Sequence, residues 1–193
     1  LKALERLGYS RGFTILDTDD QQSLVKKIAA ELEIDTKRFD ARGILSHISK
    51  LKTELTWPEH YHPTEFYPKL VARVYGAYQK TLRAINAVDF DDLIGLTVKL
   101  FTEYPNVLKN YQKRFHYILV DEYQDTSHNQ YRFVTLLAAQ HKNLFCIGDD
   151  AQSIYMFREA DIRNILNFQH DYPQGTVVML EQNYRSTKNI IAA

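Results

Sequence analysis

Apolar residues recur every three or four positions through the first hundred residues of the chain, which is the spacing of amphipathic helices. Polar residues that commonly start helices stand before these stretches. Residues 18–21 have the spacing of a capping box, and Asp40 and residues 89–92 can cap two further helices. A long helix is expected over residues 66–85, with its tyrosines packed inward. The expected core positions of these helices include Val25, Ile28, Ile44, Leu45, Ile48, Leu51, Leu70, Val71, Val74, Tyr75, Tyr78 and Leu82.

Two short apolar runs, residues 117–120 and 144–147, have the length and composition of strands buried on both faces of a parallel sheet. Between them, Ser127 and Gln130 have the spacing of a capping box that opens a helix. Such a strand–helix–strand unit has an almost always right-handed crossover and makes its two strands parallel. A third apolar run, residues 177–180, predicts another strand.

Each of these three runs ends in a turn rich in polar side chains. Asp121 and Glu122 follow the first run, and the carboxyl ends of strands are where open α/β sheets place their ligands. One carboxylate could hold Mg²⁺ while the other orients a water molecule. The alternative is an acidic turn in which Asp125 or Thr126 merely caps the next helix. The second turn adds acids and an amide, and the third adds an arginine and an aromatic ring. Together these groups are what a nucleotide triphosphate site requires.

Three successive motifs carry a resemblance to a known family. They are residues 121–126 (DEYQDT), 148–155 (GDDAQSIY) and 182–186 (QNYRS), and residues 88–93 (VDFDDL) are similar to the element that leads into them. In this order the motifs resemble those of the UvrD/Rep/PcrA-like superfamily 1 DNA helicases. Two segments near the N-terminus also resemble the helical insert of that family, so the resemblance extends over essentially the whole chain.

The resemblance implies a role for each matching residue of the first two motifs. Asp121 would bind Mg²⁺, and Glu122 would activate the water that attacks ATP. Gln124 would link the nucleotide site to neighbouring motifs. Gln152 would contact the region of the γ-phosphate and respond to hydrolysis.

The third motif and the rest of the second turn imply further contacts. Tyr184 would stack on the adenine, and Arg185 would neutralise the γ-phosphate. Tyr155 and Phe157 would present their rings to the bases of single-stranded DNA, with Arg158 beside them. Stacking of this kind does not depend on base identity. The alternative for the two rings is core packing, because they lie in an apolar run.

The sequence departs from the family pattern in two positions and lacks one motif. Ala151 stands where an acid is usual, and Glu159 stands where a glycine normally follows the arginine. A carboxylate beside Arg158 would weaken its attraction for DNA phosphate. No Gly-x-x-x-x-Gly-Lys-Ser/Thr phosphate loop occurs in these 193 residues. We therefore expect half of an active site, carried by an internal fragment that is inactive on its own.

Composition narrows the class of protein further. The 24 basic and 24 acidic residues balance, so the chain lacks the net positive charge that is typical of a dedicated DNA-binding domain. The single cysteine, Cys146, falls in a predicted buried strand and is expected to be a packing residue, as in a reducing cytoplasm. No apolar stretch approaches the roughly 20 residues that a membrane span needs. We expect a cytoplasmic protein with no membrane partner.

The sequence thus predicts an α/β chain of two units. Residues 1–87 would form a helical insert subdomain, and residues 88–193 the C-terminal part of a RecA-like P-loop NTPase domain with a parallel sheet. The resemblance implies an ATP- and Mg²⁺-dependent helicase or translocase that moves 3′ to 5′ on single-stranded DNA. Its partners would be single-stranded and duplex DNA and the remaining motor domains of the same chain. The alternatives are the motor subunit of a helicase–nuclease and a non-catalytic DNA-binding scaffold.

Overall fold

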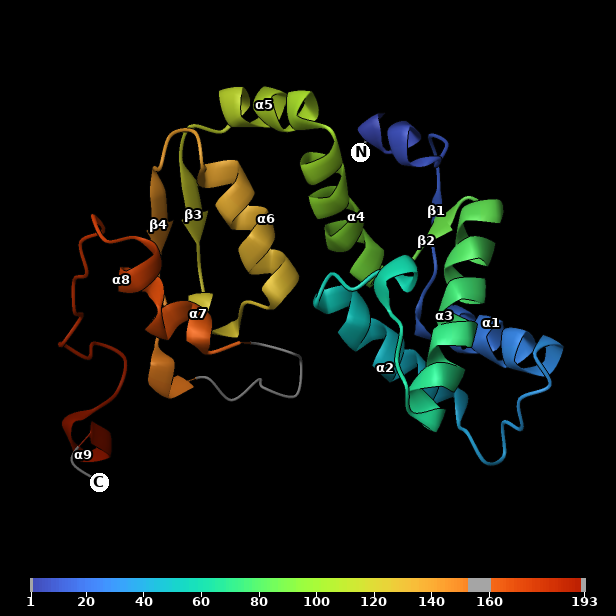
Figure 1. Cartoon of the computed structure of the whole chain (residues 1–193). Coiled ribbons are helices and arrows are strands. Elements are labelled where there is room, and N and C mark those ends of the chain that lie inside the picture. Colours follow the sequence, from blue (N-terminus) through green and yellow to red (C-terminus); the bar gives the residue numbers. More distant parts are fainter. Residues whose placement is uncertain (1, 153–160, 192–193) are drawn as a thin grey trace.

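The computed structural model describes residues 2–152 and 161–191 (Figure 1). Within those residues, helices alternate with two short parallel sheets of two strands each, which is a mixed α/β architecture. In chain order the elements are η1 (Lys2–Leu7), β1 (Thr14–Ile15), α1 (Thr18–Glu31), α2 (Ala41–Thr53), η2 (Pro58–His60), α3 (Phe66–Ala84), β2 (Ala87–Val88), α4 (Phe90–Glu103), α5 (Pro105–Arg114), β3 (Ile118–Val120), η3 (Tyr123–Asp125), α6 (His128–Ala138), β4 (Leu144–Cys146), η4 (Asp150–Gln152), α7 (Arg163–Leu166), α8 (Phe168–Asp171) and α9 (Lys188–Ile191).

The first hydrophobic core lies among helices α1, α2 and α3 (Figure 1). The apolar stripe predicted for each helix supplies this core. Val25 of α1, Ile44 of α2 and Val74 of α3 are fully buried in it, and so is Tyr78. Strand β1 pairs in parallel with β2, which ties the segment before α1 to the segment after α3. The predicted inward orientation of the α3 tyrosines at positions 75 and 78 is therefore confirmed.

A second hydrophobic core gathers η1, α4, α5 and α6. The rings of Phe101 on α4 and Phe133 on α6 stack with their centroids 6.0 Å apart. Trp57, which precedes η2, also packs into this core, and its ring lies against Gly95 of α4. Helix α4 consequently touches the N-terminal helices on one side and the β3–α6–β4 unit on the other (Figure 1).

Strands β3 and β4 pair in parallel, with Ile118 opposite Leu144 and Val120 opposite Cys146. The parallel strand–helix–strand unit predicted from the sequence is therefore confirmed. The prediction that both faces of these strands are buried is wrong. Leu119 is 74% exposed and Phe145 is 59% exposed, because α6 packs on one face and no described element covers the other.

The strand predicted over residues 177–180 is also wrong. The segment forms neither helix nor strand, and its apolar side chains are exposed, with Leu180 at 86%. A strand needs a neighbouring strand to satisfy its backbone groups, and this segment pairs with neither β3 nor β4. It leads away from the β3–β4 sheet towards α9 (Figure 1).

The predicted helix starts can be compared with the caps in the structure. For α1 the capping residue is Asp17, whose carboxylate accepts from the backbone N–H of Asp20, so the predicted box beginning at Thr18 is one residue late. The capping boxes predicted before α4 and α6 are both confirmed. They fix the first turns of the two helices that flank the site described next.

Candidate functional site

A cavity of about 880 Å³ lies between the first turn of α4 and the turns that follow β3 and β4. One wall comes from the end of α2 and the start of α4. The opposite wall comes from the acidic turns and the first turn of α6. Of the residues proposed for the site from the sequence, three line it. The lining residues are Thr53, Phe90, Asp91, Ile94, Glu122, Gln124, Asp125, Ser127, Asn129, Gln130, Ala151 and Gln152.

Glu122 occupies a strained backbone position at the carboxyl end of β3. Its φ is +50° and its ψ is +45°, the left-handed region that residues other than glycine rarely adopt. The Asp121 carboxylate accepts a hydrogen bond from the Glu122 N–H at 3.0 Å, which stabilises this conformation. Both side chains are exposed to solvent. Strain of this kind collects at functional sites, because the surrounding structure must hold the residue in place.

Gln124 connects the two acidic turns from a buried position. Its side-chain amide donates to Glu122 Oε2 at 2.7 Å, and its Oε1 accepts from the backbone N–H of Asp149 at 3.0 Å. Gln124 is only 1% exposed. A Cβ atom on Gly148 would lie 2.8 Å from Gln124 Oε1, so a glycine is needed for the turn after β4 to approach this amide. Glu122 is thereby held to the end of the neighbouring strand.

The turn after β4 is ordered around the Asp149 carboxylate. Asp149 Oδ2 accepts from the side-chain amide of Gln152 at 2.6 Å, and Oδ1 accepts from the backbone N–H of Ala151 at 3.0 Å. The residue that replaces the usual acid, Ala151, thus takes part through its backbone. Gln152 is exposed and faces the cavity shared with Glu122 and Gln124.

The turn after η3 is held by hydrogen bonds from Asp161, just before α7, and from Asn164 within α7. The Thr126 carbonyl accepts from the Asp161 N–H at 3.0 Å and from the Asn164 side-chain amide at 2.9 Å. Asp125 lines the cavity, and its Oδ1 is buried without a hydrogen-bond partner. The ring of Tyr123 packs edge-on against Phe168 with centroids 5.8 Å apart. These contacts hold the backbone under the acidic turn from several directions.

The remaining residues proposed from the sequence lie elsewhere. Tyr184 is 86% exposed and donates its hydroxyl to Gln182, and the Arg185 N–H donates to Asn183. Neither Tyr184 nor Arg185 lines the cavity, so the structure does not bring the third motif to the first two. The DNA-binding candidates Tyr155, Phe157 and Arg158, and the departure at Glu159, lie outside the described residues.

The donor set suits magnesium in its chemistry. Mg²⁺ usually binds through one or two carboxylates together with waters and substrate phosphates. Asp121 and Glu122 are adjacent, exposed carboxylates, and one Asp121 oxygen is engaged by the turn itself. No cluster of three or more His, Cys, Asp or Glu side chains suited to a metal occurs in the part of the chain that the structure describes. The residues fit a magnesium ion that waters and substrate phosphates also bind, rather than one held by protein side chains alone.

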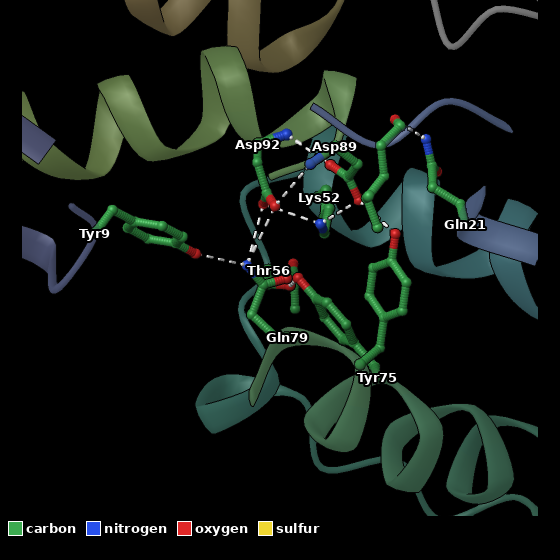
Figure 2. Close-up of polar contacts among 10 residues, drawn as sticks. Tyr9, Gln21, Lys52, Thr56, Tyr75, Gln79, Asp89 and Asp92 are labelled. Carbon is green, nitrogen blue, oxygen red and sulfur yellow. Dashed lines mark hydrogen bonds and ion pairs between the residues drawn. The ribbon is translucent and has the colours of Figure 1, made fainter. Parts of the chain in front are cut away.

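A buried charged network behind the α4 wall was not found from the sequence. Lys52 of α2 is 1% exposed, and its Nζ lies 2.6 Å from Asp89 Oδ2 and 2.9 Å from Asp92 Oδ1. Figure 2 shows these contacts together with the α3 side chains that complete the network. Lys52 follows Ile48 by four positions, so a lysine in line with the apolar stripe of α2 was the available signal.

Burial and charge change the proton affinities in this network. Burial raises the pKa of Asp92 to about 6, although Lys52 opposes the rise. Burial disfavours the charged form of Lys52, but the two carboxylates outweigh it and raise the pKa of this ammonium group. Lys52 is therefore held as a cation between two acids. Burial also raises the pKa of the Cys146 thiol on β4 to about 11, as befits an unreactive packing residue.

Short parallel strands with carboxylate and amide side chains at their carboxyl ends place the chain among α/β proteins with a ligand site at the sheet edge. The family model of the UvrD/REP helicase N-terminal domain matches residues 2–173. The chain therefore belongs to the UvrD/REP helicase family. No helix in residues 2–152 or 161–191 is both long enough and apolar enough to cross a membrane.

Curated relatives agree with this assignment. The chain is 51% identical over 192 residues to the ATP-dependent DNA helicase PcrA of Bacillus subtilis (strain 168). It is 50% identical over 191 residues to the PcrA of Staphylococcus epidermidis (strain ATCC 12228) and 49% identical over 191 residues to that of Staphylococcus aureus (strain Mu50). Each alignment covers 98% of this chain and 26% of the relative, so the chain spans about a quarter of the length of these helicases.

Proposed function

We propose that this chain forms part of an ATP- and Mg²⁺-dependent DNA helicase or translocase that moves 3′ to 5′ on single-stranded DNA. The observation that carries the proposal is the bridge from Glu122 through Gln124 to Asp149, at the edge of a parallel sheet in a UvrD/REP family chain. The names of the relatives, ATP-dependent DNA helicases, support the same activity.

Within this proposal, each side chain has a chemical task. Asp121 is the residue that would hold Mg²⁺, which supplies charge neutralisation at the phosphates when bound. Glu122 orients and deprotonates the attacking water, and the amide of Gln124 fixes its carboxylate. Gln152, tethered to Asp149, contacts the γ-phosphate region and links its state to the turn after β4. The fixed positions of these groups reduce the rearrangement that the reaction needs.

The other proposed residues complete the nucleotide and DNA contacts. Tyr184 stacks on adenine and Arg185 neutralises γ-phosphate charge, which requires the exposed segment that carries them to lie against the first two motifs. Tyr155, Phe157 and Arg158 contact single-stranded DNA. The helical unit of residues 1–87 is an insert and residues 88–193 are part of a RecA-like motor domain. The separate core among α1, α2 and α3 supports this division.

The test is DNA-dependent ATP hydrolysis and strand separation by the full-length protein that contains this chain. Duplexes with a 3′ or a 5′ single-stranded tail should be compared, with ATP and Mg²⁺ present. The proposal predicts turnover that single-stranded DNA stimulates and unwinding that prefers the 3′ tail. DNA binding without any turnover would instead support a non-catalytic scaffold and would overturn the proposal.

A further inference from the structure

The buried network around Lys52 joins three helices at one point. Lys52 stands one residue before the end of α2, while Asp89 caps α4 and Asp92, the third residue of α4, completes the capping box. The two carboxylates therefore serve both the first turn of α4 and the ammonium group of α2. From α3, the Tyr78 hydroxyl donates to Asp89 Oδ2 at 3.0 Å.

A second side chain of α3 extends the network towards the N-terminal segment. The Gln79 amide donates to Asp92 at 3.2 Å and to the Tyr9 hydroxyl at 3.4 Å (Figure 2). The nearby Tyr75 hydroxyl donates to the Thr56 carbonyl at 3.2 Å, just beyond the end of α2. All the charged members of the network are at most 2% exposed at their side chains. The relative positions of α2, α3 and α4 are thus fixed by directional contacts.

Charge is an inefficient way to stabilise a core. Replacing a buried ion pair by apolar side chains of similar volume is often neutral or stabilising, because desolvation offsets the attraction. This network has one cation and two carboxylates within 3 Å of it, which makes desolvation especially costly. What charged hydrogen bonds provide beyond apolar packing is a defined geometry. The network is therefore better suited to fixing a position than to adding stability.

The position that it fixes is one wall of the cavity at the candidate site. Thr53 directly follows Lys52, and Phe90 and Asp91 lie between Asp89 and Asp92 in the chain. Thr53, Phe90 and Asp91 all line the cavity opposite Glu122. Gly95, one turn further along α4, lies close to the Lys52 carbonyl and the Trp57 ring, so α2 and α4 touch closely here.

We propose that Lys52 is a positioning residue, which by pairing with Asp89 and Asp92 sets the distance between the α4 wall of the cavity and the Glu122 turn. The effect of Lys52 on ATP hydrolysis rests on the proposed function of the full-length protein. The geometric part of the proposal concerns this chain alone. Lys52 itself lines neither the cavity nor the acidic turns and acts through the first turn of α4.

The geometric test compares Lys52→Met with Lys50→Met in the 193-residue chain. Lys50 is exposed on the same helix and serves as the matched control. Amide hydrogen exchange should accelerate about tenfold or more in residues 90–93 and 121–125 of the Lys52 variant, while α1 exchanges as in the parent. Trp57, the only tryptophan, should report the same change through a shifted emission maximum. Acceleration spread evenly over all helices, or none in residues 121–125, would overturn the proposal.

If Lys52→Met fails to fold, an uncharged version of the network can test the positioning role separately from overall stability. The triple variant Lys52→Met, Asp89→Asn, Asp92→Asn keeps the volumes and retains side chains that cap helices well. It leaves no buried charge uncompensated, so its urea midpoint should stay close to that of the parent. The proposal predicts faster exchange in residues 90–93 and 121–125 all the same. Unchanged exchange there would show that the charges are dispensable and would refute it.

The functional test uses the full-length protein with the Lys52→Met and Lys50→Met substitutions. A displaced cavity wall should lower kcat for ATP by roughly 10²-fold, as expected for an ångström-scale misplacement, with KM nearly unchanged. The Lys50 variant should match the parent. An unchanged kcat in the Lys52 variant would contradict the positioning role. If the parent itself lacks turnover, the proposed function fails, whereas the exchange experiment still decides the geometry.

Discussion

Replacing Gln124 by methionine removes the bridge between the two acidic turns while keeping the length of the side chain. The substitution deletes one hydrogen bond to the Glu122 carboxylate and leaves the Asp149 N–H without its side-chain acceptor. Asp149 is exposed and this bond is only part-buried, so its loss costs about 0.5–1.5 kcal/mol, the usual net value of a hydrogen bond. The bond to Glu122 adds less than a fully buried charged bond would, because that carboxylate is exposed.

We therefore expect Gln124→Met to lower the free energy of unfolding by about 1–2 kcal/mol. The measurement is urea denaturation followed by circular dichroism, with two-state behaviour checked by tryptophan fluorescence. Gln169→Met, at an exposed glutamine of α8, is the matched control and should change stability by less than about 0.5 kcal/mol. If both variants lose the same small amount, the bridge does not stabilise the turns and the reasoning is refuted.

Three further substitutions test other parts of the structure. Gly148→Ala should lower the unfolding free energy by about 1–3 kcal/mol in a thermal melt, because its Cβ would lie 2.8 Å from Gln124 Oε1. Asn164→Leu should cost about 1–2 kcal/mol in urea denaturation, because it removes the amide that donates to the Thr126 carbonyl. Asp92→Asn should change how stability depends on pH. Folding raises the Asp92 pKa from 3.8 to about 6, so the folded chain binds more protons between these values and this group disfavours folding as pH rises through them. The Asn variant lacks this loss, so urea midpoints should show it gaining on the parent between pH 4 and pH 7. A constant difference across that range would contradict the assignment.

The sequence predicted the local elements well, because their signals are local. Helical periodicity located α2 and α3, and capping boxes located the starts of α4 and α6. The strand–helix–strand rule then gave the parallel pairing of β3 with β4. Each of these features depends on residues within about one turn or one connection of each other.

What the sequence did not predict depends on contacts between distant segments. The predicted burial of Leu119 and the predicted strand at residues 177–180 would each need a further layer or strand beside the sheet. No described element supplies one. The pairing of Lys52 with Asp89 spans 37 residues and required knowing that α2 ends beside α4. Likewise, the adjacency of Asp121 and Glu122 could be read from the sequence, whereas the cavity that Glu122 shares with the first turn of α4 could not.

We propose that Glu122 activates the water that attacks ATP in a DNA-stimulated motor. The most direct measurement is steady-state ATP hydrolysis by the full-length protein and its Glu122→Gln variant, with and without single-stranded DNA. Glu31→Gln, at an exposed glutamate of α1, is the control. If Glu122 has this role, the parent and the control should show DNA-stimulated turnover, and the Glu122 variant should lose a factor of roughly 10²–10⁴ in rate while still binding ATP. Normal hydrolysis by Glu122→Gln, or a parent without DNA-stimulated turnover, would contradict it.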